Sequence, residues 1–114
     1  MSDKLASDYA DSIIEGIRAD IEAGNVFGIN EDTEEENTAY DYLEDVLDIL
    51  YVVTGDKEYR GAMIQIAWGG PGAWIDTTDR TLTVSWGSDK AVRYLPSEFI
   101  DGLDEALAEL WAIN

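Results

Sequence analysis

The spacing of apolar residues changes twice along this chain of 114 residues, and the change sets the fold class. Near the N-terminus, apolar side chains recur every three or four residues, which is the period of an α-helix. From Ile49 the period becomes two and β-branched residues increase, as in strands. After Pro96 the helical period returns. The sequence therefore predicts a single α+β domain in which helices precede and follow the strands of an antiparallel sheet along the chain.

The first predicted helix carries an apolar stripe with a repeat of four residues and ends at Gly24–Asn25. Acidic residues spaced three or four apart occupy the opposite face, together with Arg18, so this face is expected to lie in solvent. The stripe consists of Tyr9, Ile13, Ile17 and Ile21, and the acidic residues are Asp8, Asp11, Glu15 and Glu22.

A second helix is predicted from Asp32 or Thr33 to about residue 50. Either residue can cap a helix, and the glutamates that follow would lie in the first turn, where the helix dipole favours negative charge. Its apolar stripe is Tyr40, Leu43, Leu47 and Leu50. The sequence thus predicts two N-terminal helices, the second of them starting in a strongly acidic stretch.

Turn signals divide the middle of the chain into short strands. Residues 55–61 are expected to form a hairpin loop, and Gly69–Gly72 and residues 78–80 are expected to form turns. The segments between them predict an antiparallel meander of three to four strands. These strands are expected among five candidate segments, which are Leu50–Thr54, Ala62–Trp68, Ala73–Thr77, Thr81–Trp86 and the short segment Ala91–Leu95.

A closing helix is predicted after Pro96–Ser97 and is expected to pack on one face of the sheet. Trp68, Trp86 and Trp111 are expected to fill the core between the sheet and this helix. Trp74 is expected to be partly exposed, where it could anchor an interface. The apolar stripe of the closing helix is Phe99, Leu103, Leu107, Leu110 and Trp111.

The chain has no cysteine and no histidine, which excludes most nucleophilic catalysis and most transition-metal sites. The loop from Asp56 departs from an EF-hand because Arg60 stands where an oxygen ligand belongs. Gly69–Gly72 lacks the lysine and hydroxyl residue of a P-loop. We therefore expect no enzyme, no metal and no cofactor. A small enzyme or a calcium-binding protein is the alternative, which calorimetry with divalent ions would test.

Charge bears most directly on function, because 25 acidic and 7 basic residues give a net charge of −18. Residues 1–50 carry −13 and residues 51–114 carry −5. Between Glu31 and Asp48 there are nine carboxylates and no base. In a helix they would give one charge per ~3 Å of axis, against ~1.7 Å for duplex DNA. The nine are Glu31, Asp32, Glu34, Glu35, Glu36, Asp41, Glu44, Asp45 and Asp48.

This segregation predicts a surface that binds a basic, nucleic-acid-binding protein, since nucleic acid and anionic membranes would themselves be repelled. The alternative is a salt-adapted proteome, which would spread acids over the whole surface. A homodimer would double the length of the acidic surface. Met1–Leu5 has no leader character, so we expect the cytoplasm of a bacterial host. The candidate contacts are the nine carboxylates with Asp8, Asp11, Glu15, Glu22 and Trp74.

The stretch from Tyr59 to Thr77, YRGAMIQIAWGGPGAWIDT, and the closing stretch from Ile100 to Trp111, IDGLDEALAELW, resemble small acidic proteins of phages and mobile elements of Gram-positive bacteria. The size and charge of the chain also resemble those of anti-CRISPR and antirestriction proteins, several of which imitate DNA. The resemblance implies an inhibitor that blocks the nucleic-acid-binding groove of a host defence effector, with a Cas9-type effector as the first candidate. The alternative is a non-enzymatic acidic module that binds another basic protein.

Overall fold

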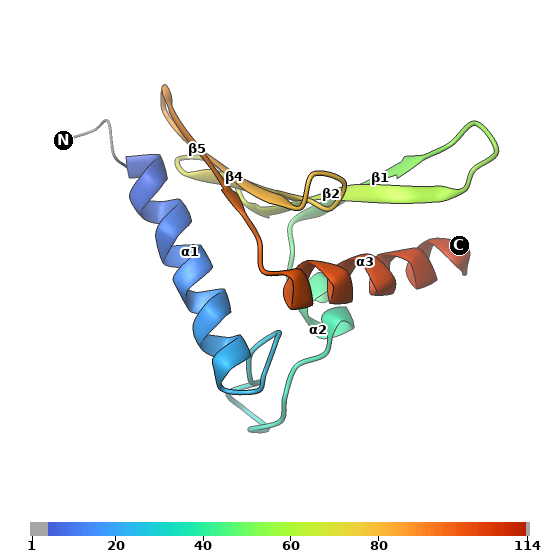
Figure 1. The fold of residues 1–114 in the computed structure, drawn as a ribbon, viewed down its shortest axis with the longest axis horizontal. Coiled ribbons are helices and arrows are strands. Elements are labelled where there is room, and N and C mark those ends of the chain that lie inside the picture. The colour runs from blue at the N-terminus through green and yellow to red at the C-terminus, as the bar shows by residue number, and fades with distance from the viewer. Residues whose placement is uncertain (1–4, 114) are drawn as a thin grey trace.

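Helices cover one face of a five-stranded antiparallel sheet in the computed structural model, which describes residues 5–113 (Figure 1). The α+β class and the helices at both ends of the chain are confirmed. The helices are α1 (Leu5–Glu22), α2 (Ala39–Glu44) and α3 (Ser97–Ala112). The strands are β1 (Asp48–Val53), β2 (Tyr59–Ala67), β3 (Gly72–Asp76), β4 (Thr81–Trp86) and β5 (Asp89–Tyr94).

The sheet is a meander in which each strand pairs with its neighbours in the sequence, in the order β1-β2-β3-β4-β5. The predicted meander is therefore correct, whereas the predicted number of three to four strands is wrong. The last segment is a full strand, because β5 pairs with β4 from Thr81↔Tyr94 to Trp86↔Asp89. Strand β5 ends at Tyr94, one residue before the predicted end at Leu95. The Leu95 amide donates to the Arg80 carbonyl, just outside β4.

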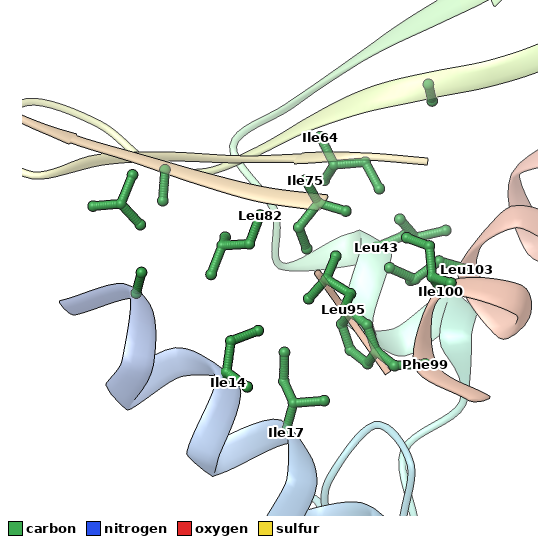
Figure 2. Packing of buried hydrophobic residues seen from close by; sticks show 14 of the residues in the cluster. Ile14, Ile17, Leu43, Ile64, Ile75, Leu82, Leu95, Phe99, Ile100 and Leu103 are labelled. Atoms are coloured by element: carbon green, nitrogen blue, oxygen red, sulfur yellow. The ribbon is translucent and has the colours of Figure 1, made fainter. Parts of the chain in front are cut away.

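The core lies between the sheet and the helices, because successive strand residues point to opposite faces. Ile64, Ile75 and Leu82 are fully buried on the face that the helices cover. Figure 2 shows Ile14 of α1 and Leu103 of α3 beneath these strand residues. Helix α1 packs against β4 and β5, α3 packs against β2, and α2 packs against α3. No helix of residues 5–113 lies on the opposite face of the sheet (Figure 1).

Helix α1 ends close to the predicted position, but its buried face is turned from the predicted stripe: Ala6, Ala10, Ile14 and Ile17 are buried, whereas Tyr9, Ile13 and Ile21 are half-buried. Gly24 has a φ of 87°, and its amide bonds to the carbonyl of Ile21 at 3.0 Å. The amide of Asn25 bonds to the carbonyl of Asp20 at 2.9 Å. This pair of hydrogen bonds is a Schellman motif, which ends a helix at a residue with positive φ and favours glycine there.

The predicted second helix is wrong in length, because only the six residues of α2 are helical. A capping box starts it at Thr38: the Thr38 hydroxyl accepts a bond from the Asp41 amide, and the Asp41 carboxylate accepts one from the Thr38 amide. The acidic residues before Thr38 form a loop, and Asp48 already belongs to β1. The residues of β1 after Asp48 are β-branched, aromatic or otherwise apolar, so they join the sheet.

Helix α3 buries Phe99, Leu103 and Leu107 of its predicted stripe. Trp86 packs against Tyr9 of α1, at 5.9 Å between ring centroids, and not against the closing helix as predicted, whereas Trp111 packs as expected, 5.2 Å from Tyr51. Trp68 does not: its side chain is 77% exposed, because β2 ends at Ala67 and Trp68 stands in the following loop. No helix within residues 5–113 is long and apolar enough to cross a membrane.

Candidate acidic interface

Charge divides between the two layers of the molecule more sharply than between the two halves of the sequence. We call residues 5–45 and 97–113 the helical half, and residues 46–96 the sheet half. The helical half contains eighteen acidic residues and one base, Arg18, for a net charge of −17. The sheet half contains six acidic and five basic residues, for a net charge of −1. The described part of the protein is therefore acidic almost entirely on its helical side.

The carboxylates of the helical half come from four segments and are exposed, with the exception of the half-buried Asp104. Because α3 folds back beside α1 and α2, its acids join those of the first 45 residues (Figure 1). The eighteen are Asp8, Asp11, Glu15, Asp20 and Glu22 on α1, Glu31, Asp32, Glu34, Glu35 and Glu36 before α2, Asp41, Glu44 and Asp45 in and after α2, and Glu98, Asp101, Asp104, Glu105 and Glu109 on α3.

Residues 28–37 form a closed loop that presents five exposed carboxylates; we call it the acidic loop. The Asn37 amide bonds to the Gly28 carbonyl at 2.9 Å, and the Asn30 amide bonds to the Glu35 carbonyl at 2.8 Å. The Asn30 side-chain oxygen accepts hydrogen bonds from the amides of Asp32 and Thr33 at 2.8 and 3.2 Å. Local hydrogen bonds of this kind compete with helix formation. They explain why the predicted helix does not start here.

An aromatic cluster fastens the acidic loop to the core. Phe27, directly before the loop, has its ring centroid 5.4 Å from that of Phe99 and 6.1 Å from that of Tyr42. The Asn37 side-chain amide also donates to the Phe27 carbonyl at 3.3 Å. Helix α3 makes room for the ring at Gly102, where an added Cβ would lie 2.7 Å from the nearest Phe27 carbon. Gly102 is unfavourable for helix propensity, but its lack of a side chain lets the Phe27 ring pack directly against α3.

The nine carboxylates predicted between Glu31 and Asp48 do not form one helical row. Five lie in the acidic loop, three lie in or directly after α2, and Asp48 lies in β1. Asp41 also caps α2, with its carboxylate 2.8 Å from the Thr38 amide. Alternation along β1 turns Asp48 toward the sheet face that no helix covers. The charge density that we calculated along a helix axis therefore does not apply to this segment.

The predicted contacts on α1 are exposed, but one of them already has a cationic partner. The Arg93 guanidinium donates from Nε to Asp11 at 2.7 Å and from a terminal nitrogen to the Ser7 hydroxyl at 2.7 Å. Asp8, Glu15 and Glu22 have no such neighbour among the ion pairs of the described residues. Asp11 is consequently the weakest of the four as a contact for an external cation.

Sequence reasoning missed the acids of α3 as part of this surface. Glu98, Glu105 and Glu109 are exposed on the helical side, whereas Asp101 pairs with Arg80 at 2.8 Å. Asp104 accepts a hydrogen bond of 2.6 Å from the Tyr59 hydroxyl. Burial, and after it this hydrogen bond, raises the pKa of Tyr59. Counting charge by predicted helix and strand, in place of sequence halves, would have found these residues.

Trp74 is not part of the acidic surface. It lies half-buried on the uncovered face of the sheet, with its ring against Gly72, where an added Cβ would lie 3.1 Å from a ring carbon.

Within residues 5–113 no three carboxylates come together in an arrangement that could hold a metal ion. The hairpin loop from Thr54 to Glu58 closes on itself through the Thr54 hydroxyl and amide.

Comparison of the chain with protein-family models, with curated proteins and with solved structures finds no match.

Proposed function

We propose that this protein is an acidic inhibitor that occupies the nucleic-acid-binding groove of a basic protein and excludes nucleic acid from it. The observation that carries the proposal is the division of charge, with −17 on the helical half and −1 on the sheet half. A uniformly salt-adapted surface would not favour one layer. Guided by the resemblance to anti-CRISPR proteins, we propose a Cas9-type defence effector as the first target to test.

The density of charge on the helical half supports imitation of DNA. If about half of the accessible surface of 7142 Å² belongs to the helical half, it carries one net charge per roughly 200 Å², against roughly 100 Å² for duplex DNA with one charge per ~1.7 Å. The two densities differ by about a factor of two. Lysine and arginine side chains arranged for phosphates could therefore find carboxylate partners on this surface.

The order of the acidic loop also supports the proposal. A loop held by its own backbone hydrogen bonds and by Phe27 needs little further ordering when it binds. Its five carboxylates are exposed in the free protein and require no rearrangement to meet a cation. We therefore place the acidic loop, with the exposed acids of α1, α2 and α3, at the contact.

The test is competition between this protein and target DNA for a guide-loaded Cas9-type effector, measured at two salt concentrations. We expect a complex that excludes DNA and weakens as salt rises, because each carboxylate–cation contact is screened. A complex that leaves DNA binding intact would contradict imitation of DNA and would instead identify an acidic module that binds elsewhere on a basic protein.

Two matched variants locate the contact. Changing Glu34, Glu35 and Glu36 to Lys reverses three charges in the acidic loop, and changing Asp56, Glu58 and Asp79 to Lys reverses three exposed charges in the sheet half. Both variants change the net charge by the same amount. We expect the first to weaken the complex at least about tenfold more than the second, which corresponds to ~1.4 kcal/mol. Equal weakening would mean that net charge alone governs binding.

A further inference from the structure

Two adjoining hollows open on the helical half, and Tyr40 of α2 lines both of them. The first, of about 270 Å³, lies between α2 and α3, and the second, of about 180 Å³, lies between α2, β1 and α3. We call the two hollows together the Tyr40 groove. Its uncharged lining residues, besides Tyr40, are Ala39, Gly102 and Ala106 in the first hollow and Leu43, Ile49 and Leu110 in the second.

Every charged residue that lines the Tyr40 groove is a carboxylate. Glu105 and Glu109 line the first hollow, and Glu44 lines the second. All three are exposed, and none of them forms an ion pair with another residue of the described range 5–113. The groove therefore combines an apolar lining with negative charge that no cation of the described chain neutralises.

Two of these carboxylates oppose the stability of the helix that carries them. Glu105 and Glu109 are four residues apart on α3, where like charges repel each other. Glu109 also lies in the last turn of α3, which contains no base and where the helix dipole disfavours negative charge. Helix formation thus does not explain these residues, whereas an external cation would relieve both unfavourable interactions.

The geometry points to an arginine side chain of the basic partner as the occupant of the first hollow. This inference rests on the proposed function and assigns one anchor within its acidic surface. The Tyr40 ring is 40% exposed, so a planar guanidinium can stack on it while its donors face Glu105 and Glu109. The apolar stem of the arginine would cover Ala39 and Ala106. A lysine has neither the plane nor the fork of donors and fits less well.

The second hollow adds an apolar side chain to this requirement. Leu43, Ile49 and Leu110 line it, with Glu44 as its only charged residue. In an extended segment, residues two apart in the sequence point to the same side, so an arginine followed two residues later by a leucine can occupy both hollows across Tyr40. Each hollow is smaller than the about 300–1,000 Å³ of typical small-molecule sites, which favours side chains of a protein as the occupants.

The first test uses the full chain and the peptide acetyl-Ala-Arg-Ala-Leu-Ala-amide, titrated at about 0.15 M NaCl and followed by the backbone amide signals in NMR spectra. We expect the amides of the groove residues to shift. The same peptide with citrulline, which has the shape of arginine without its charge, should bind at least about tenfold more weakly, and the peptide with lysine about threefold more weakly.

Matched variants separate the groove from the net charge. Changing Glu105 and Glu109 to Gln should weaken binding of the arginine peptide about tenfold, and changing Glu34 and Glu35 to Gln should leave it within about twofold, although both variants lose two charges. The first variant should also raise the midpoint of thermal unfolding by about 1–4 °C, because it removes the repulsion on α3. Weaker binding by a more stable protein is not the result of a damaged fold.

The second test measures the complex with a guide-loaded Cas9-type effector. We expect Tyr40→Ala to weaken the complex at least about fivefold more than Tyr94→Ala, which removes an exposed tyrosine of the sheet half, and Tyr40→Phe to stay within about twofold of wild type. An arginine peptide that binds no better than the citrulline peptide, or that shifts no groove amide up to about 5 mM, overturns the inference.

The two tests also distinguish this inference from the proposed function. If the effector is bound but Tyr40→Ala acts like Tyr94→Ala, the groove is not the anchor and the inference is overturned, whereas the proposed inhibition stands. If no effector is bound but the arginine peptide occupies the groove, the proposed inhibition fails, and the assignment of the groove to an arginine is supported by the peptide alone.

Discussion

The two halves of this molecule share one core and meet solvent in opposite ways. The helical half carries a net charge of −17, and its surface residues are mainly carboxylates. The sheet half carries a net charge of −1 and leaves Leu50, Met63, Val92 and Tyr94 exposed. Fold stability requires neither pattern, because the buried residues between the layers already form the core. The contrast teaches that one core supports two outer faces of different chemistry.

The largest expected effect separates the two faces of a single strand. Ile64 is fully buried toward the helices, whereas its neighbour Met63 is 38% exposed on the uncovered face. Ile64→Ala should lower the free energy of unfolding by about 2–5 kcal/mol, and Met63→Ala by less than about 1 kcal/mol. Urea denaturation followed by tryptophan fluorescence measures both. Similar losses for the two variants would mean that Met63 is buried in solution, and would contradict the contrast between the two faces of the sheet.

Alkaline pH probes the aromatic cluster beneath the acidic loop. Burial raises the pKa of Tyr42 to about 12 in the folded protein, above the unfolded value of 10.0. The folded state therefore holds this proton more tightly, and the resulting stability is complete below pH 10 and is lost as the pH rises to about 12. The loss should be about 2–3 kcal/mol.

Tyr42→Phe provides the control for this pH dependence. The variant should be close to wild type in stability at pH 7 and should lose less stability than wild type between pH 10 and pH 12. Tyr59, whose pKa is also raised, remains in both proteins and cancels in the difference. Identical curves for the two proteins would contradict a buried Tyr42 in the helical half.

Replacing a helical glycine by alanine should change the free energy of unfolding in opposite directions at Gly102 and Gly16. Gly102→Ala would bring a methyl group to 2.7 Å from Phe27 and should lower the free energy of unfolding by about 1–3 kcal/mol. Gly16 on α1 has nothing within 4 Å of an added Cβ, so Gly16→Ala should raise it by up to about 1 kcal/mol. Thermal unfolding measures both. A gain at both positions would show that Phe27 does not sit on α3.

The smallest expected effect concerns salt. Raising NaCl from about 0.02 to about 0.5 M should stabilise the wild-type protein by about 1 kcal/mol, because it screens repulsion among the carboxylates of the helical half. The variant with Glu34, Glu35 and Glu36 changed to Lys should show a smaller salt effect than the variant with Asp56, Glu58 and Asp79 changed to Lys. The same urea titrations at each salt concentration give the values, and equal salt effects would contradict a segregated charge.

Much of the fold could be predicted because its signals are local. The stripes of α1 and α3, and the turns of the meander, depend on residues close in the sequence. The predicted length of the second helix was wrong because the glutamates among residues 31–36 favour a helix by composition. The Asn30 side chain instead accepts hydrogen bonds from the backbone amides of Asp32 and Thr33, which holds this segment as a loop. Trp68 was misplaced because the end of β2 depends on pairing, which composition does not reveal.

The candidate surface could be predicted only in part. The acidity of the first 50 residues is visible in the sequence, but the addition of the α3 carboxylates and the separation of Asp48 and Trp74 from the rest depend on how the layers stack. The neutralisation of Asp11 requires Arg93, which is 82 residues away in the sequence. Long-range partners of this kind leave no pattern that local reasoning can use.

The sequential order of the strands has a consequence for the route by which the chain folds. Each hairpin of the meander can form from residues close in the sequence, so the sheet closes only short loops. Helix α1, by contrast, must bring Asp11 to Arg93 across almost the whole chain. We expect α1 to dock after the sheet has formed, so weakening its contacts should accelerate unfolding and leave the folding rate nearly unchanged. The most acidic half of the protein would then be assembled last, on a sheet that is already in place.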